Sequence, residues 1–173
     1  MADIARYHLS RSCDKGFNRE QNAFVESYGS QLLDASILLL PAVGFLPASD
    51  PRVRGTIEAI EKYMMRDGFV LRHDPREISE ERQPIEGAFL ACTLWLADAH
   101  VLSGDIAKAQ ALFDRVVGIA NDLGLLAEEF DSSEGRQTGN FPQALTHIAL
   151  INTAHNLSDA KQPIEKPAMQ RSK

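Results

Sequence analysis

The sequence predicts an all-α protein in which surface helices alternate with buried ones. Some segments carry their apolar residues on a single stripe, and the segments between them are apolar almost all the way round. The first pattern is typical of an outer, amphipathic helix, and the second of an inner helix that neighbours cover on most sides. Strand-like alternation is confined to residues 23–28. Helices stacked in such pairs form either an open solenoid or a closed ring of hairpins.

Three segments have the outer pattern. The first, at the opening of the chain, is weak and rests on Ile4, His8 and Leu9. The second is expected to begin at Asp50, which can accept hydrogen bonds from a first helical turn, with Pro51 in the first helical position, and to end at Gly68. The third begins near Asp105 and ends before Gly124. The stripes of the second and third segments are Val53, Ile57, Ile60 and Met64, and Ile106, Ala109, Phe113, Val116 and Ala120.

The inner pattern covers residues 32–40, 88–96 and 144–151. In a ring of hairpins the inner helices all point the same way, so the loops that lead into them meet at one rim. Carboxylates stand at these starts: Asp34, Glu86, Glu128, Glu129 and Asp131. The positive end of a helix favours a carboxylate for structural reasons alone. Because three inner helices share this placement of carboxylates, a functional site at the rim is a stronger hypothesis than helix stabilisation alone.

Composition and charge narrow the classes of function. Of the 173 residues, 44% are apolar and 24% charged, which is ordinary for a globular domain. A net charge of −6 argues against a nucleic-acid partner, because such partners require clustered Lys and Arg, and it suits a neutral substrate. The longest apolar run, residues 35–46, is interrupted by Pro41 and Gly44. We therefore expect a cytoplasmic protein with neither a membrane span nor a secretion signal.

The chain is expected to form one domain over residues 1–157. A disordered tail is expected at 158–173, where apolar periodicity stops and Pro163 and Pro167 appear. Cys13 and Cys92 lie far apart and lack the Cys/His spacing of a metal site. Reduced thiols are therefore expected, with no metal and no cofactor.

Carboxylates at a rim suggest glycoside hydrolysis. That reaction requires one carboxylic acid to protonate the leaving oxygen and one carboxylate to attack the sugar or to activate water. Four segments make the suggestion specific. They are Tyr-Gly-Ser-Gln-Leu-Leu-Asp-Ala-Ser at 28–36, continued by Gly-Phe-Leu-Pro at 44–47 and Asp-Pro-Arg-Val at 50–53; Gly-Phe-Val-Leu-Arg at 68–72; Glu-Gly-Ala-Phe-Leu-Ala-Cys-Thr-Leu-Trp at 86–95; and Gly-Leu-Leu-Ala-Glu-Glu at 124–129 with Gly-Asn-Phe-Pro-Gln-Ala-Leu-Thr-His at 139–147.

In this order and spacing the segments resemble the bacterial and archaeal branch of glycoside hydrolase family 15, the glucoamylase and trehalase-like enzymes. The resemblance runs from about residue 16 to 157 and implies an (α/α)6 toroid, of which this chain would form about the C-terminal half. It also implies an inverting mechanism on α-linked glucose units, with an α-linked oligosaccharide or trehalose as substrate.

The resemblance also assigns roles to residues. The general base of the family stands in a Leu-Leu-Pro-Glu-Gln type motif, which Leu-Leu-Ala-Glu-Glu at 125–129 matches with Glu128 in that place. Glu129 is the alternative base or a neighbour of the base. The resemblance further implies that Arg72 donates to sugar hydroxyls and that Glu86 helps to hold the substrate. Further candidates for substrate contact are Tyr28, Asp34 and His147, although a histidine inside an apolar helix is more often a hydrogen-bonded core residue.

The general acid of the family lies in a Trp-Glu motif upstream of the segment at 28–36, and this sequence has no such motif. Trp95, its one tryptophan, precedes Leu96. Three hairpins cannot close a ring of six, so an exposed apolar wall is expected. The chain is expected to be inactive alone, either as a truncated reading frame or as part of a split enzyme whose other chain supplies the acid.

Two alternatives remain open. Ser-Gly-Asp at 103–105, followed by Ala107, Ala109 and Phe113, resembles one turn and helix of a tetratricopeptide unit, which favours a helical-repeat interaction module. One unit is present, whereas that fold requires about three. The other alternative is a non-catalytic sugar-binding remnant.

Overall fold

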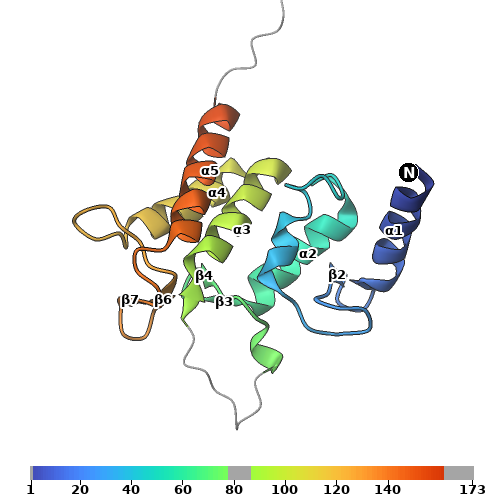
Figure 1. Ribbon diagram of the computed structural model, residues 1–173, viewed down its shortest axis with the longest axis horizontal. Helices are drawn as coiled ribbons and strands as arrows, with labels where there is room; N and C mark the ends of the chain where they lie inside the picture. Colours follow the sequence, from blue (N-terminus) through green and yellow to red (C-terminus); the bar gives the residue numbers. More distant parts are fainter. Residues whose placement is uncertain (1, 78–86, 162–173) are drawn as a thin grey trace, which may run out of the picture.

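Helices dominate the computed structural model, which describes residues 2–77 and 87–161 (Figure 1). The helices are α1 (Ala2–Lys15), the 3-10 helix η1 (Ala35–Leu39), α2 (Pro51–Tyr63), the 3-10 helix η2 (Pro75–Glu77), α3 (Leu90–Ser103), α4 (Ile106–Val117) and α5 (Ala144–Lys161). The prediction of a helix-dominated chain is therefore confirmed. The prediction that helices would account for all regular structure is wrong, because short strands connect them.

The strands form three small antiparallel sheets. They are β1 (Phe17–Asn18) with β2 (Ala23–Phe24), β3 (Met65–Arg66) with β4 (Phe69–Val70), and β5 (Ala88–Phe89), β6 (Glu129–Asp131) and β7 (Arg136–Thr138) in that order. In the third sheet Ala88 pairs with Phe130 and Phe130 pairs with Gln137. Of the described strands, β2 lies in the stretch 23–28 where alternation was noted. The others are too short to show an alternating pattern in the sequence, which explains why they were not predicted.

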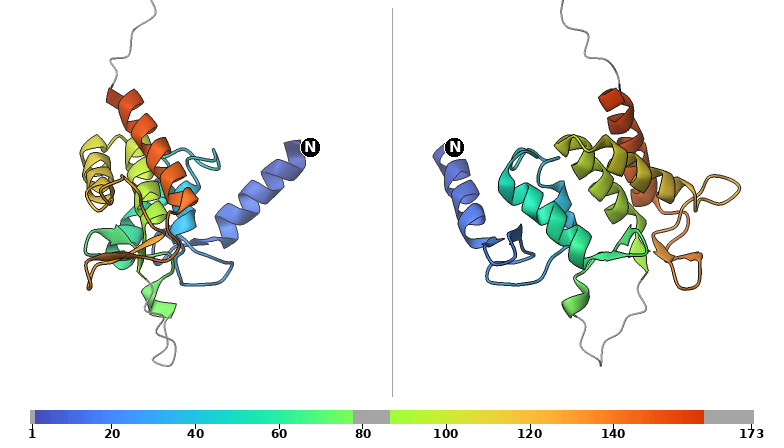
Figure 2. Two further views of the ribbon diagram at one scale, coloured as in Figure 1. Left: turned by 60° about the vertical axis from the view of Figure 1, so that its left-hand side comes forward. Right: turned by 180° about the vertical axis from the view of Figure 1, so that it is seen from behind.

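Helix α3 is the centre of the molecule, packed between α4 and α5 (Figures 1 and 2). Leu90, Leu94 and Leu96 are fully buried on it. Each such side chain contributes about 1.5–3 kcal/mol when it leaves water. Both α3 and α5 begin beside the β5–β6–β7 sheet and run away from it (Figure 1). We refer to the side of the molecule where these helices begin as the rim.

Helix α2 begins as the sequence predicts. The side chain of Asp50 accepts a hydrogen bond from the backbone N–H of Arg52 at 2.9 Å, and Pro51 is the first helical residue. The helix ends at Tyr63, however, and Gly68 does not terminate it. Gly68 instead occupies the turn between β3 and β4 with a φ of +86°, a conformation that favours glycine.

The apolar run at 32–40 was expected to be an inner helix, and this prediction is wrong. Only Ala35–Leu39 is helical, as the 3-10 helix η1. Leu33 donates its N–H to Asp74 at 3.0 Å and Asp34 pairs with His73, so the backbone before η1 is held extended. Pro41 follows closely and lacks the N–H group that a longer helix would need.

The other two inner helices form, with shifted boundaries. In the segment expected at 88–96, Ala88 and Phe89 belong to β5, and α3 starts at Leu90. Helix α5 extends to Lys161, so its last four residues fall in the stretch that was expected to be a disordered tail. Residues 162–173 lie outside the described part of the chain.

Replacing Leu94 tests the central place of α3. Because Leu94 is fully buried, Leu94→Ala is expected to lower the free energy of unfolding by about 2–5 kcal/mol. Leu123→Ala is the control, since Leu123 is 76% exposed, and it should change stability by less than about 0.5 kcal/mol. Urea denaturation followed by circular dichroism measures both values, and equal losses in the two variants would contradict the packing described.

Candidate functional site

Glu128 lies at the rim, in the segment that leads from α4 into β6. Its carbonyl accepts a hydrogen bond from the N–H of Leu90, the first residue of α3, at 3.1 Å. Its own N–H donates to the carbonyl of Asn140 at 3.0 Å. The backbone of Glu128 is thus fixed between the start of α3 and the loop that precedes α5.

The two residues before Glu128 are held as firmly. Leu126 donates its N–H to Nε2 of His147 at 3.2 Å, and its carbonyl accepts from Gln143 at 2.9 Å. The N–H of Ala127 donates to Oε1 of Gln137, and its carbonyl accepts from Oγ1 of Thr146 at 2.9 Å. All six backbone polar groups of residues 126–128 are therefore paired, as burial demands of the first two residues.

The carboxylate of Glu128 is oriented by Asn140. Its Oε2 accepts from the side-chain Nδ2 of Asn140 at 2.9 Å and from the Asn140 backbone N–H at 3.2 Å. Gly139 lies against the same side chain with a φ of +77°, and an added Cβ there would lie 3.0 Å from Cβ of Glu128. Oε1 receives no hydrogen bond from the residues that the structure describes. One oxygen of Glu128 is thus held and the other is left for a further partner.

Glu129 points its carboxylate at a different group. Its Oε2 accepts from the backbone N–H of Gly87 at 2.9 Å, and its backbone pairs with Phe89 and Thr138 across the sheet. It therefore fixes the entry to β5 and α3. The role of Glu129 as alternative base stays a prediction.

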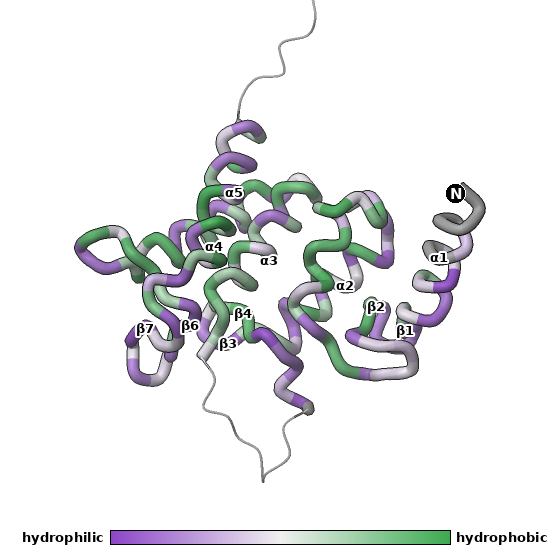
Figure 3. The backbone as a smooth tube through the Cα atoms, viewed as in Figure 1, coloured by the Kyte–Doolittle hydropathy of each residue, from purple (hydrophilic) through white to green (hydrophobic). Residues whose placement is uncertain are grey.

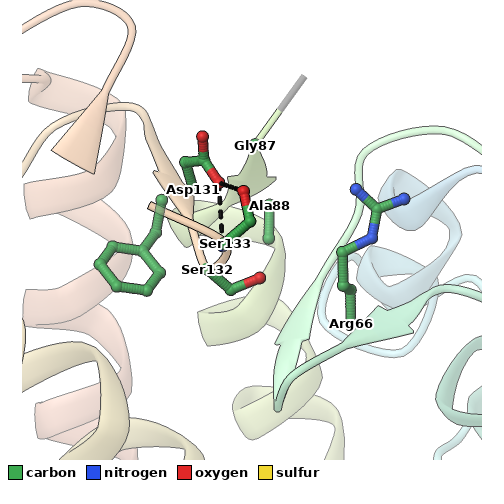
Figure 4. Close-up of a pocket in the computed structure, with 7 residues that line it drawn as sticks. Arg66, Gly87, Ala88, Asp131, Ser132 and Ser133 are labelled. Carbon is green, nitrogen blue, oxygen red and sulfur yellow. Dashed lines mark hydrogen bonds between the residues drawn. The ribbon is translucent and has the colours of Figure 1, made fainter. Parts of the chain in front are cut away.

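A pocket of about 80 Å³ adjoins Glu129, lined by Arg66, Gly87, Ala88, Phe130, Asp131, Ser132 and Ser133 (Figure 4). Oδ1 of Asp131 accepts from the hydroxyl and the N–H of Ser133 at 2.6 and 2.9 Å. The Ser133 hydroxyl, with the backbone N–H groups of Glu134 and Ser133, lowers the pKa of Asp131. Binding sites for small ligands measure about 300–1,000 Å³, so this pocket is too small for a disaccharide.

Arg72 and Asp34 lie together at the start of η1. Nε of Arg72 is 3.6 Å from Oδ2 of Asp34, and Nδ1 of His73 is 3.5 Å from the same oxygen. The other carboxylate oxygen, Oδ1, accepts from the N–H of Ser36 at 2.7 Å. Arg72 Nε is buried without a hydrogen-bond partner among the described residues. Asp34 thus lies beside Arg72 and His73 and caps the start of η1, and the roles of Asp34 and Arg72 in binding substrate stay predictions.

Asp74, which the sequence analysis did not single out, anchors this cluster. Its side chain is fully buried, and Oδ1 accepts from the N–H and Nε of Arg76, both at 2.9 Å. Burial by itself raises the pKa of Asp74, but hydrogen bonds from Arg76 and Leu33 outweigh it and lower the pKa. The signal for this residue was in the sequence. Asp-Pro-Arg at 74–76 repeats Asp-Pro-Arg at 50–52, where the same cap and ion pair form.

The remaining predicted contacts are separated. The hydroxyl of Tyr28 lies 3.1 Å from Oγ of Ser12 in α1, at the end of the molecule away from β6 and β7 (Figure 1). His147 does lie beside the 126–128 segment, where its Nε2 is an acceptor, so the ring proton is on Nδ1. Glu86 lies outside the described residues. The roles of these three residues in binding substrate stay predictions.

The described ranges hold neither a metal-binding cluster nor a helix that could span a membrane. Within residues 2–77 and 87–161, no group of three or more His, Cys, Asp or Glu side chains is placed to hold a metal ion. In the same ranges, no helix has the length and apolarity to cross a membrane. The cytoplasmic location stays a prediction.

The family that the sequence matches defines the class of protein, the glycosidases. Residues 1–155 match the sequence model of the family described as Glycosyl hydrolases family 15, and the chain belongs to that family. The trehalase of Mycobacterium tuberculosis (strain ATCC 25618 / H37Rv) is 40% identical over 149 residues, which are 86% of this chain and 22% of the relative. The trehalase of Thermoplasma volcanium is 40% identical over 147 residues, or 85% and 23% of the two chains.

Solved structures share the fold. A wild-type glycosidase superposes with a TM-score of 0.75 at 21% identity, covering 91% of this chain and 44% of that chain. A variant glycosidase in complex with glucose gives a TM-score of 0.73 with the same coverage. This chain therefore spans about a fifth of the length of the trehalases and less than half of the solved glycosidases.

The pH dependence of stability tests the anchoring role of Asp74. Because its folded pKa is lowered, Asp74 stabilises the fold above its unfolded pKa of about 3.9, and this contribution is lost as the pH falls toward the folded pKa. Asp74→Asn is thus expected to be less stable than the parent at pH 7 and to approach it below about pH 4. Urea midpoints at pH 3, 5 and 7 measure the difference. Asp122→Asn, at an exposed position, is the control; a pH-independent difference for Asp74→Asn would refute the role.

Proposed function

We propose that this chain forms about the C-terminal half of the (α/α)6 catalytic toroid of an inverting, trehalase-like glycoside hydrolase, and that Glu128 is its general base. The observation that carries the proposal is the fixed position of Glu128. Its backbone is paired on both sides, one carboxylate oxygen is held by Asn140, and the other faces no described donor.

An inverting base requires this arrangement. It must hold a water molecule on the face of the sugar opposite the leaving group, across a gap of about 6.5–9.5 Å from the acid. A carboxylate that rotated freely would aim that water poorly, whereas Oε2 of Glu128 is fixed by two donors of Asn140. Oε1 then accepts the proton as the water attacks the anomeric carbon.

Arg72 is proposed to bind hydroxyl groups of the substrate. Its guanidinium is partly exposed, and Asp34 on one side limits its rotation. A planar guanidinium presents several donors in a fixed geometry, which suits pairs of oxygen acceptors. Trehalose is the proposed substrate because the relatives at about 40% identity are trehalases.

The general acid is proposed to come from the other half of the toroid, as the missing Trp-Glu motif requires. The isolated chain is then inactive, since a base without an acid leaves the departing oxygen unprotonated. The non-catalytic sugar-binding remnant and the helical-repeat module remain alternatives. Binding of trehalose without hydrolysis by a complete toroid would favour the first, and binding of peptides in place of α-glucosides would favour the second.

A chimera tests the catalytic role. Residues 16–157 replace the matching part of a trehalase about 40% identical to them, which supplies the other half of the toroid. Glu128→Gln should lower kcat by about 10²–10⁴-fold, the value of general base catalysis, while KM changes little because the glutamine oxygen still accepts from Asn140.

Glu129→Gln in the same chimera is the matched control, because it alters the neighbouring carboxylate. Its kcat should fall by less than about tenfold, because removal of a general base lowers kcat by at least about 10²-fold. If Glu129→Gln abolishes turnover and Glu128→Gln does not, the base is Glu129 and the assignment is wrong.

A further inference from the structure

His147 lies in the first turn of α5, and its side chain is half-buried. The tube coloured by hydropathy shows α5 as mainly apolar near the strands and polar at its far end (Figure 3). Nε2 of the His147 ring accepts a hydrogen bond from the backbone N–H of Leu126 at 3.2 Å. The ring therefore joins α5 to the segment that carries Glu128, which lies two residues beyond Leu126.

This bond requires a neutral imidazole. A backbone N–H group can only donate, so Nε2 must present its lone pair to Leu126 and the ring proton must be on Nδ1. An imidazolium carries a hydrogen on both nitrogens and accepts no hydrogen bond. Uptake of a second proton by the ring of His147 therefore breaks the bond to Leu126.

The N–H group of Leu126 has no second acceptor at hand. Leu126 is fully buried, and among residues 2–77 and 87–161 its N–H donates to Nε2 of His147 alone. A buried N–H group that loses its partner cannot replace the bond with water unless the chain moves. We therefore expect the segment to shift when the ring is protonated.

His147 is the one titratable partner of the backbone groups of residues 126–128. The other five partners are amide groups and a hydroxyl, which keep their protonation state between pH 5 and pH 8. They are the N–H groups of Leu90 and Gln143, the carbonyl of Asn140, Oε1 of Gln137 and Oγ1 of Thr146. Of the six bonds that hold this backbone, proton uptake in that range removes the one to His147.

We propose that His147 is a positioning residue for Glu128 and a pH-sensitive switch, whose neutral ring holds the 126–128 segment in place and whose protonated ring releases it. The effect on catalysis rests on the proposed function, in which Glu128 is the base. Asn140 binds both the backbone N–H and the carboxylate of Glu128, so a shift of the backbone also displaces the carboxylate. A misplacement of about 1 Å can cost a catalytic group about 10²-fold in rate.

Other charged or titratable groups lie on α5 and on the elements around it. They are Asp98 and His100 on α3, Asp114 and Arg115 on α4, Asp122 in the loop after α4, Glu128 and Glu129 at the start of β6, Glu134 and Arg136 in the β6–β7 hairpin, and His155 and Asp159 on α5. Asn156 donates to Asp98 at 3.0 Å, and His100 pairs with Glu61 at 3.1 Å. Burial raises the pKa of Asp98, and His100 is a second imidazole, so these two are alternatives as the titrating group.

Hydrogen exchange of the full chain tests the switch. The protection factor of the Leu126 amide compares its exchange rate with that of an unfolded peptide at the same pH. It should fall at least about fivefold between pH 8 and pH 5, the range in which imidazole changes its charge. The amide of Leu94, inside α3, is the internal control and should change less than about twofold.

Two substitutions of His147 separate the acceptor from the bulk of the side chain. His147→Gln is the conservative variant, because its side-chain oxygen can accept from Leu126 at either pH, and its protection factors at pH 5 and pH 8 should agree within about twofold. His147→Leu offers no acceptor and should give low protection at both pH values. Circular dichroism confirms that each variant is folded. If His147→Leu is not, the parent and His147→Gln decide the test.

Variants of the other groups identify which one titrates. Asp98→Asn, His100→Gln and Glu128→Gln should each keep the fall in Leu126 protection that the parent shows. A variant that abolishes the fall assigns the titration to its own group and overturns the inference. No fall in the parent, or an equal fall in His147→Gln, overturns it as well.

Turnover by the trehalase chimera gives the catalytic readout. Between pH 8 and pH 5, kcat of the parent chimera should fall at least about fivefold more than that of His147→Gln, while their KM values differ less than about twofold. If Glu128→Gln retains turnover but the exchange result holds, the proposed function fails and the switch in the fold remains. If Leu126 exchange does not depend on pH while Glu128→Gln abolishes turnover, the base assignment holds and the switch is refuted.

Discussion

The pairing of six backbone groups at residues 126–128 is the constraint on which the rim depends. Leu126 and Ala127 are buried, so each of their N–H and C=O groups must find a partner or cost about 1–3 kcal/mol. The partners come from α5, β7 and the loop before α5, and Glu128 adds the first residue of α3. Moving Glu128 would therefore require breaking bonds to several elements at once. This makes the position of the carboxylate a property of the packed fold.

The same principle positions Arg72, by a different route. The 3-10 helix η1 is joined to the segment that follows β4, where Ala35 donates its N–H to the carbonyl of Arg72 at 3.1 Å. Buried Asp74 holds Leu33 on one side and Arg76 on the other. A buried carboxylate tolerates removal from water only when it is paired and hydrogen-bonded, and Asp74 meets both conditions. Glu128 and Arg72 are thus held by separate sets of hydrogen bonds. Both sets reach the first turn of α3, where Leu90 donates to Glu128 and Thr93 accepts from Val70.

The sequence predicts the long helices and their beginnings well, because those features are local. The apolar stripe of α4 is formed by residues a few positions apart, and Asp105 caps Lys108, which is also a few positions away. The run at 32–40 misleads, because its backbone is taken by Asp74 and His73, which lie about forty residues away. Most strands were missed because they are only two or three residues long, and β5 also because Ala88 pairs with the distant Phe130. Helix α2 ends earlier than predicted because the chain enters β3 at Met65.

The candidate site shows the same division between local features, which the sequence predicts, and contacts between distant residues, which it does not. Glu128 was identified from a short motif, whereas the groups that orient it lie 9 to 38 residues away in the sequence. His147 was judged to be either a core residue or a substrate contact, and its Nε2 accepts a hydrogen bond from Leu126, two residues before Glu128. The neighbouring residues in the sequence do not reveal such a contact. A histidine on an apolar helix has the same sequence context whichever N–H group donates to its ring.

Hydrogen bonds within the fold explain why Glu128 is so well ordered. The backbone of Glu128 and one oxygen of its carboxylate are held by bonds within the described residues, so the fold itself orients the proposed base. The pocket beside Glu129 measures about 80 Å³, which is smaller than the sites that hold ligands of disaccharide size. For the proposed activity, further walls of a disaccharide site must come from surface outside the described residues. Such walls would shield the sugar from bulk solvent while leaving beside Glu128 the one water molecule that an inverting base activates.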